Sequence, residues 1–320
     1  MTGNEMYFSD LASTLQNVSN DEKAVFVSGQ PGSGKTFAAL QFCAEHKESL
    51  YFSFKNLDTA FALRVFCNSR TDIFGGCESW NDFFSCLKHY GNKKHPLVFF
   101  DNAGERNDKD DFYAVLNNFL ESDSKITLVL LGRPWEAPPI PCREVEINYF
   151  SMPQLADVCS LSDETAAKLY RLTGAIPSLL PLYDNKQSFE DNIKTFLHTD
   201  SAFYRLAASW MTDCFRTSES YNTLLYAMAN GCNRIGEIAK FSGFPKNKCD
   251  KYIKALIEHG LVIKEPGESG HTKYLPANTY LTLWYKCLLA AVPNADGSFG
   301  EDVFNRFMQV FNDELMADFL

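Results

Sequence analysis

The sequence lacks any pair of cysteines separated by two residues, the spacing typical of zinc sites and thiol redox motifs. Its ten cysteines occur singly. Their even number does not exclude disulfide bonds, but a chain of 320 residues can form a stable core without them. It lacks an apolar run long enough to cross a bilayer, because residues 281–292 are too few and contain Lys286. Met1–Met6 has neither the basic start nor the apolar stretch of a secretory leader. We therefore expect a cytoplasmic protein with reduced thiols and no membrane partner.

Charge is also modest, at 22% of residues, and it is unbalanced. Thirty basic and forty acidic residues give a net charge of −10. This charge argues against non-specific binding of nucleic acid by the whole molecule, but it does not exclude binding by a single basic face. The 45% of hydrophobic residues exclude a wholly disordered or fibrous chain, and the length suits two or three domains. No internal repeat or low-complexity tract is present.

The first half of the chain alternates short apolar runs with amphipathic stretches. The runs at 97–101 and 126–131 show no polar alternation, as expected for strands that are buried on both faces. Strands are predicted at 24–28, 50–54, 97–101, 126–131 and 144–148, with helices at 35–46, 79–89 and 110–120. This alternation predicts an α/β domain with a mostly parallel, doubly wound sheet over residues 1–150.

A glycine-rich loop between the first strand and its helix fits G-x-x-x-x-G-K-[ST] at every fixed position. Such glycines let backbone N–H groups turn toward phosphate oxygens, and the helix adds the positive end of its dipole. We expect Lys35 to reach the β- and γ-phosphates of ATP, and the Thr36 hydroxyl to bind Mg²⁺. The predicted nucleotide-binding residues of this P-loop are Gly29, Gln30, Pro31, Gly32, Ser33, Gly34, Lys35 and Thr36.

A carboxylate ends the strand predicted at 97–101. Asp101 would lie at the carboxyl edge of the sheet beside the phosphates, as the second protein ligand of Mg²⁺. P-loop ATPases with a strand inserted between these two motifs usually place a glutamate next, to polarise the attacking water. Here the residue is Asn102, whose amide holds a water but cannot accept its proton, although Glu105 or Asp108 could substitute. The sequence therefore favours nucleotide binding over fast hydrolysis.

Two further residues are candidate nucleotide contacts. Arg133 follows the strand 126–131, where a cation can contact the γ-phosphate or stabilise charge in the transition state; the alternative is a surface arginine in a loop. Pro177 ends the segment Gly174–Pro177, similar to an element that joins a helical lid to the nucleotide in several P-loop ATPases; the alternative is a simple helix break.

The rest of the chain is predominantly helical. Ser151 and Ser162 begin two helices of a predicted lid. Farther on, three helices and a β-hairpin predict a winged helix-turn-helix. The resulting domains are the α/β domain at 1–150, the lid at 151–201, the winged helix at 202–290 and a helical tail at 291–320.

Binding of double-stranded DNA by the winged helix is an open question. Residues 217–287 hold nine basic and six acidic residues, a local charge of about +3 in a chain of −10. Four lysines lie on or just before the predicted recognition helix, which contains no arginine to read guanine. These lysines are Lys246, Lys248, Lys251 and Lys254. A solvated helix used for protein or interdomain contacts is the alternative.

The order of these parts resembles the archaeal-type ATPase family, a P-loop group of the AAA-related and STAND-like branch. The resemblance rests on Gly29–Thr36, Leu97–Asp101, Leu131–Arg133, Thr173–Pro177 and the winged helix, and spans residues from about 8 to 290. It implies a P-loop NTPase fold. Two features differ from the family pattern, since residues 7–10 do not match the usual Gly-Arg-Glu element and Asp101-Asn102 replaces Asp-Glu. Many members continue into a nuclease-like domain, and no nuclease activity is expected here.

These observations predict an ATP-dependent molecular switch that binds ATP or ADP with Mg²⁺ between the α/β domain and the lid and hydrolyses ATP slowly. No N-K-x-D motif is evident, which favours adenine over guanine. One alternative is a DNA-binding regulator with a vestigial nucleotide site. Another is an oligomeric motor or loader that receives an arginine from a neighbouring subunit.

Overall fold

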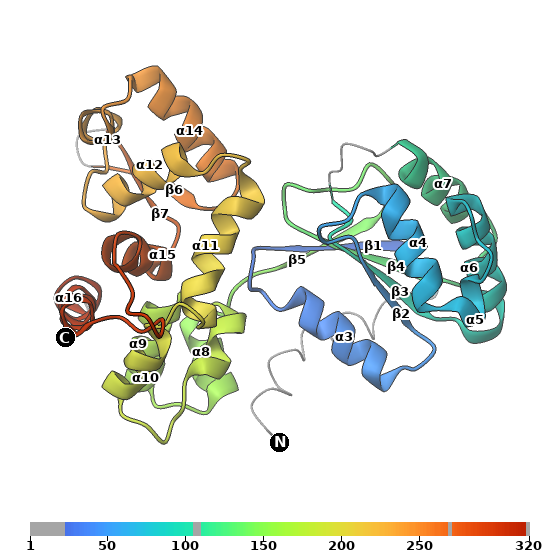
Figure 1. The fold of residues 1–320 in the computed structure, drawn as a ribbon, viewed down its shortest axis with the longest axis horizontal. Coiled ribbons are helices and arrows are strands. Elements are labelled where there is room, and N and C mark those ends of the chain that lie inside the picture. Colours follow the sequence, from blue (N-terminus) through green and yellow to red (C-terminus); the bar gives the residue numbers. More distant parts are fainter. Residues whose placement is uncertain (1–22, 105–109, 268–270, 318–320) are drawn as a thin grey trace. The chain divides into compact units, whose positions relative to one another are not determined.

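The structure is a computed structural model that describes residues 23–104, 110–267 and 271–317 (Figure 1). The chain divides into two compact units, residues 1–148 and 149–320. The first unit holds a five-stranded sheet, and the second is built mostly of helices.

The sheet of the first unit is entirely parallel, which confirms the predicted α/β class. Its strands lie in the order β2-β3-β4-β1-β5. Their bounds are β1 Ala24–Gly29, β2 Leu50–Ser53, β3 Leu97–Asp101, β4 Thr127–Gly132 and β5 Arg143–Ile147. Because β4 lies between β1 and β3, the strand that precedes the glycine-rich loop and the strand that ends in Asp101 are not neighbours.

Helices cover both faces of this sheet (Figure 1). Ala38 and Ala39 of helix α3 pack on the face formed by Val25, Val27 and Phe99. The opposite face packs against helices α4, α5, α6 and α7. The helices are α3 Lys35–Glu45, α4 Thr59–Ser69, α5 Thr71–Phe74, α6 Trp80–Lys94 and α7 Asp110–Glu121. Helices α4 and α5 were not expected from the sequence.

Phenylalanine dominates the larger core. The Phe52 ring lies with its centroid 4.9 Å from that of Phe66 and 5.7 Å from that of Phe100, while Phe74 and Phe83 stack at 4.2 Å. The fit is close, since a Cβ added at Gly91 of α6 would lie 2.2 Å from a side-chain carbon of Ile126. The many phenylalanines therefore form one packed layer between the sheet and α4–α7.

The second unit consists of helices and one antiparallel hairpin. Serine side chains cap the starts of four helices, which are preceded by Ser151, Ser162, Ser188 and Ser201. The helices are α8 Met152–Cys159, α9 Asp163–Thr173, α10 Phe189–Phe196, α11 Ala202–Cys214, α12 Glu219–Ala229, α13 Ile235–Ser242, α14 Lys246–Glu258, α15 Thr279–Leu283 and α16 Glu301–Val310. Strands β6 Val262–Pro266 and β7 Thr272–Pro276 form the hairpin, and shorter turns are the 3-10 turn η1 Pro177–Leu182 and the π-helical turns η3 Trp284–Leu288 and η4 Phe311–Leu315.

Buried hydrogen bonds join α11 to the segment around α15. The Tyr280 hydroxyl accepts a bond from the Ala207 N–H at 2.8 Å and donates to the Phe203 carbonyl at 2.6 Å. The Trp284 indole N–H donates to the Tyr204 carbonyl at 3.1 Å. These bonds fix α15 and η3 against α11 within the second unit. No helix in the described part of the chain is both long and apolar enough to cross a membrane.

Candidate functional site

Backbone geometry requires glycine at three places in the loop between β1 and α3. Gly32 and Gly34 have φ values of 82° and 89°, in the left-handed region that strains other residues. A Cβ at Gly29 would lie 2.7 Å from the Ile147 carbonyl oxygen. Together the glycines allow the Gly29–Thr36 loop to wrap tightly around the start of α3, where the first N–H groups of a helix have no partner within the helix.

The Lys35 ammonium group lies inside this loop. It donates to the Gly29 carbonyl at 2.7 Å, the Gln30 carbonyl at 3.3 Å and the Ser33 hydroxyl at 3.1 Å. Burial lowers the pKa of Lys35 to about 8; the Asp101 carboxylate opposes this shift and the Arg133 cation adds to it. The loop therefore holds a partly desolvated cation that an anionic ligand would stabilise.

Asp101 accepts hydrogen bonds at both carboxylate oxygens. The Thr36 hydroxyl donates to Oδ2 at 2.6 Å, and the Tyr51 hydroxyl donates to the same oxygen at 2.7 Å. The Asn102 N–H donates to Oδ1 at 2.9 Å. Asp101 is buried, with 4% of its surface exposed. A hydroxyl and a carboxylate in contact are oxygen donors of the kind that Mg²⁺ prefers, so Thr36 and Asp101 fit a magnesium ion that also takes ligands from phosphate and water.

Sequence reasoning missed Tyr51, which lies on β2. The register pairs Ser53 with Asp101, so Tyr51 lies two residues earlier on the same face of the sheet. Burial and the neighbouring Asp101 carboxylate raise the pKa of Tyr51 above its usual value, so its hydroxyl stays protonated and donates. No local pattern along 50–54 reveals this contact, because it depends on the register in which β2 pairs with β3.

Asn102 occupies an unusual backbone conformation. Its φ of 56° lies in the left-handed region, and its N–H also contacts the Leu131 carbonyl at 3.0 Å. Its side chain supplies an amide where a carboxylate would accept a proton from water. Glu105 and Asp108, the substitutes considered above, lie outside the described residues.

Arg133 follows β4 and is held by a carboxylate that the sequence did not single out. The Arg133 backbone N–H donates to Glu136 Oε2 at 2.9 Å, and the guanidinium Nη1 lies 3.8 Å from Glu136 Oε1. The guanidinium also lies 5.8 Å from the centre of the Trp135 ring. A Cβ at Gly104 would lie 2.8 Å from Glu136 Oε2, so this carboxylate packs against the segment that follows Asp101.

The structure thus brings Lys35, Thr36, Asp101, Asn102 and Arg133 to one edge of the sheet. Pro177 belongs to the second unit, where it is buried at the start of η1, and its predicted contact with a nucleotide stays a prediction. Among the described residues, no group of three or more His, Cys, Asp or Glu side chains is arranged to hold a metal ion.

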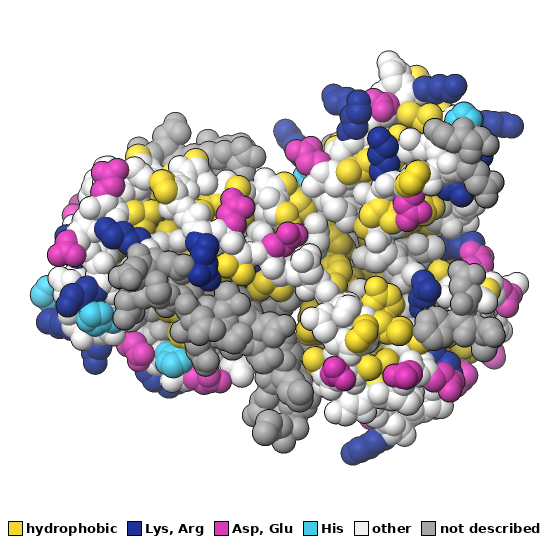
Figure 2. Space-filling model, turned by 180° about the vertical axis from the view of Figure 1, so that it is seen from behind, with side chains coloured by type: hydrophobic (Ala, Val, Ile, Leu, Met, Phe, Trp, Pro, Cys, Tyr) yellow, Lys and Arg dark blue, Asp and Glu magenta, His cyan; other side chains and the backbone are white. Residues whose placement is uncertain are grey.

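The lysines of α14 differ in their surroundings. Lys246 and Lys251 are exposed, and Lys254 forms an ion pair with Asp250 at 2.7 Å. The Lys248 ammonium lies 3.8 Å from the centre of the Phe244 ring. Figure 2 shows lysine and arginine side chains gathered at the upper right, over the region of α13 and α14. The view in Figure 2 therefore shows basic side chains over this part of the chain.

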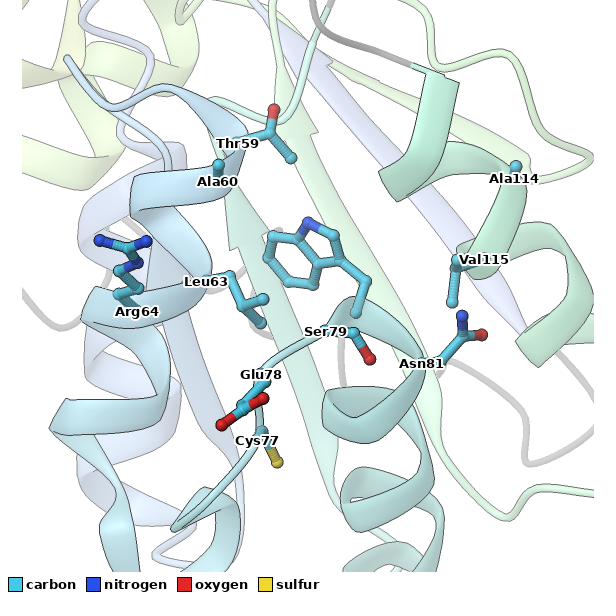
Figure 3. A pocket seen from close by; sticks show the side chains of 11 residues that line it. Thr59, Ala60, Leu63, Arg64, Cys77, Glu78, Ser79, Asn81, Ala114 and Val115 are labelled. Carbon is cyan, nitrogen blue, oxygen red and sulfur yellow. The ribbon is translucent and has the colours of Figure 1, made fainter.

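A separate cavity of about 980 Å³ lies between α4, α6 and α7 in the first unit (Figure 3). Its walls include Leu63 and Arg64 of α4, Cys77 before α6, and Val115 of α7. None of the predicted site residues lines it. The cavity is therefore distinct from the edge that holds Lys35 and Asp101.

No protein-family model matches this chain, and no curated protein matches it. Among solved structures it is similar to a signal transduction ATPase with numerous domains (STAND) that has a tetratricopeptide repeat sensor, from Pyrococcus horikoshii. Identity is 16%, the TM-score is 0.40, and the match covers 96% of this chain but 45% of that one, so this chain spans less than half of its length. It is also similar to the RuvB Holliday junction branch migration motor of Thermotoga maritima, with 15% identity, a TM-score of 0.37, and 82% and 88% of the two chains covered. Likenesses this distant carry no argument about the chemistry of this chain.

Proposed function

We propose that this protein is a P-loop ATPase that binds ATP with Mg²⁺ and acts as a nucleotide-dependent switch with slow hydrolysis. The observation that carries the proposal is the 2.6 Å contact between Thr36 and Asp101, which joins the end of the glycine-rich loop to the end of β3. This is the pairing of hydroxyl and carboxylate that a triphosphate-bound Mg²⁺ uses in P-loop proteins.

Each residue of the edge has a defined task in this proposal. The loop N–H groups and the start of α3 bind phosphate oxygens, and the Lys35 ammonium exchanges its bonds to Gly29 and Gln30 for the β- and γ-phosphates. Mg²⁺, held through Thr36 and Asp101, would neutralise phosphate charge when bound. Arg133 is the cation that senses the γ-phosphate.

The absence of a carboxylate at Asn102 accounts for slow hydrolysis. General base catalysis contributes about 10²–10⁴-fold to a rate, so an amide at this position leaves a long-lived triphosphate state. A long-lived state suits a switch, since nucleotide binding stabilises one conformation until hydrolysis releases it.

Calorimetric titration with ATP, ADP and GTP in the presence of Mg²⁺ tests the proposal. We expect ATP and ADP to bind, and saturating ATP at about 100 times Kd to stabilise the fold by about 2.7 kcal/mol. Lys35→Ala should abolish this stabilisation, whereas Lys47→Ala, which changes an exposed lysine beyond the end of α3, should retain it. Absence of any nucleotide binding at millimolar concentration would refute the proposal.

A phosphate-release assay separates a binder from a hydrolase. Wild-type protein should release phosphate slowly, and Asn102→Glu should raise the rate by about 10-fold or more. Unchanged release in a variant that still binds ATP would show that position 102 does not limit turnover.

A DNA-binding regulator is the second candidate, with the three helices α12–α14 and the β6–β7 hairpin acting as a winged helix. The observation that favours it is the exposure of Lys246 and Lys251 on a segment of about +3 charge. Retention of the protein on duplex DNA should fall steeply as the salt concentration rises, and it should be lost in the Lys248→Glu, Lys251→Glu double variant. Lys168→Glu on α9 is the matched control, and equal retention of both variants would exclude this surface.

A further inference from the structure

The order of the strands places the segment after β4 at the centre of the candidate site. Because β4 lies between β1 and β3, residues that follow β4 emerge between the Gly29–Thr36 loop and the segment Asp101–Gly104. Glu136 is the carboxylate of this segment. It comes three residues after Arg133, at the edge where the γ-phosphate of a bound nucleotide would lie.

Contacts on two sides fix the Glu136 side chain. One oxygen accepts the Arg133 N–H, and the carboxylate as a whole lies beside the Arg133 guanidinium. On the other side it packs on Gly104, where a Cβ would come within 2.5 Å of the Glu136 Cβ and 2.8 Å of its Oε2. Only 23% of the side chain is exposed. The carboxylate is therefore held against the segment that contains Asn102, without occupying position 102 itself.

Electrostatics agrees with this position. The charge of Glu136 raises the pKa of Lys35, whereas the charge of Arg133 lowers it, so both groups act on the ammonium inside the loop. Lys35, Asp101, Arg133 and Glu136 form one group of interacting charges. Within this group Asp101 already accepts hydrogen bonds from Thr36 and Tyr51, and it is assigned to Mg²⁺ together with Thr36. Glu136 is the other carboxylate of the group, and it has no part in binding Mg²⁺.

We propose that Glu136 is the general base for ATP hydrolysis, in the role that Asn102 cannot fill. The inference rests on the proposed function. In the step, the water oxygen forms a bond to the γ-phosphorus while the bond from that phosphorus to the β–γ bridging oxygen breaks. ADP leaves with the electron pair of that bond, and the proton of the water passes to the Glu136 carboxylate, which later releases it to solvent.

The pairing with Arg133 gives this base a second property. In this structure the guanidinium Nη1 of Arg133 lies 3.8 Å from Glu136 Oε1. A γ-phosphate that attracts Arg133 would draw the cation away and leave the carboxylate free to act. Hydrolysis is thereby tied to the presence of the γ-phosphate.

The central test compares Glu136→Gln with the wild type in two assays. Mg·ATP binding, measured by calorimetry, should change by less than about 3-fold, whereas phosphate release should fall by about 100-fold or more. Glu121→Gln, a change of an exposed carboxylate at the end of α7, is the matched control and should leave both unchanged. Glu136→Asp should retain part of the activity.

A rescue experiment separates a general base from a structural role. Asn102→Glu introduced into the Glu136→Gln protein should restore phosphate release to within about 10-fold of the Asn102→Glu single variant, because a carboxylate then lies at the usual position. If Glu136→Gln released phosphate as fast as the wild type, the inference would be overturned, and another carboxylate would have to be the general base. The proposal that the protein binds ATP would be unaffected by this result. The inference also fails if wild-type protein binds ATP but releases no phosphate, or if the double variant binds ATP and stays inactive. If Glu136→Gln does not fold, a partial loss of phosphate release in a folded Glu136→Asp supports the inference and full release opposes it.

Discussion

The lowered pKa of Lys35 predicts that ATP binding takes up a proton. In the ligand-free protein this pKa falls from its ordinary 10.5 to about 8 because the ammonium is buried. A triphosphate beside the ammonium favours the charged form and returns the pKa toward its ordinary value. Binding should therefore take up about 0.1 proton at pH 7, about 0.5 at pH 8 and about 0.9 at pH 9.

Calorimetry in buffers of different ionisation enthalpy measures this number directly, since the slope of the apparent binding enthalpy against the buffer enthalpy is the number of protons exchanged. Above pH 8 a terminal phosphate is fully ionised, so the nucleotide itself contributes little to the number of protons exchanged on binding. Lys35→Arg, which carries a charge that does not titrate in this range, is the control and should take up no proton. Uptake that is constant from pH 7 to pH 9 in the wild type would refute the reasoning.

The same shift affects stability without ligand. Between pH 8 and pH 10.5 the unfolded chain holds a proton on Lys35 that the folded chain has released, so the free energy of unfolding rises with pH across this window. Burial of the charged form then destabilises the folded protein by up to about 3 kcal/mol at neutral pH. Lys35→Met should remove this destabilisation, and denaturant unfolding at pH 7 should show a more stable variant that no longer responds to pH in this window.

Three further predictions concern the magnesium pair and the two cores. Asp101→Asn should leave Mg²⁺-free ATP binding in place but abolish the increase in affinity that Mg²⁺ causes, as calorimetry with and without the metal can show; a full increase would contradict the assignment. Gly91→Ala should destabilise the first unit by about 1–3 kcal/mol, because the added Cβ overlaps a neighbouring isoleucine, whereas Gly236→Ala in an open, exposed part of α13 should be neutral or stabilising; thermal unfolding decides. Tyr280→Phe should cost about 1–3 kcal/mol in denaturant unfolding, since it leaves a buried N–H and a buried carbonyl without their partner. A cost below about 0.5 kcal/mol would show that these groups find other partners.

Local patterns were sufficient for much of the first unit. The apolar runs that became β1 to β4 are short, and the run that became β5 alternates polar with apolar residues, so their type did not depend on distant contacts. The glycine-rich loop was equally local, because its chemistry is carried by residues adjacent in the chain. Helices α4 and α5 were missed because phenylalanine, threonine and other modest helix formers interrupt the segment, and because α5 has only four residues. The Asp58 side chain that caps α4 was the signal available.

The contacts of Tyr51 with Asp101 and of Glu136 with Gly104 could not be found in this way. Tyr51 contacts Asp101 only because β2 pairs with β3 in one register, and a shift of one residue would turn its side chain to the other face. Glu136 reaches Gly104 only through the path of the chain after β4. Both contacts join segments that are far apart in the sequence, so no local pattern contains them.

The left-handed backbone at position 102 restricts which side chains suit it. Asparagine adopts this conformation more readily than most residues, whereas a longer carboxylic side chain there incurs strain of about 1 kcal/mol unless the peptide reorients. Two bonds from the same N–H, to Leu131 and to Asp101, oppose reorientation. A protein engineer who installs glutamate here to speed the reaction would consequently trade part of the fold's stability, and would do better to relax the turn first.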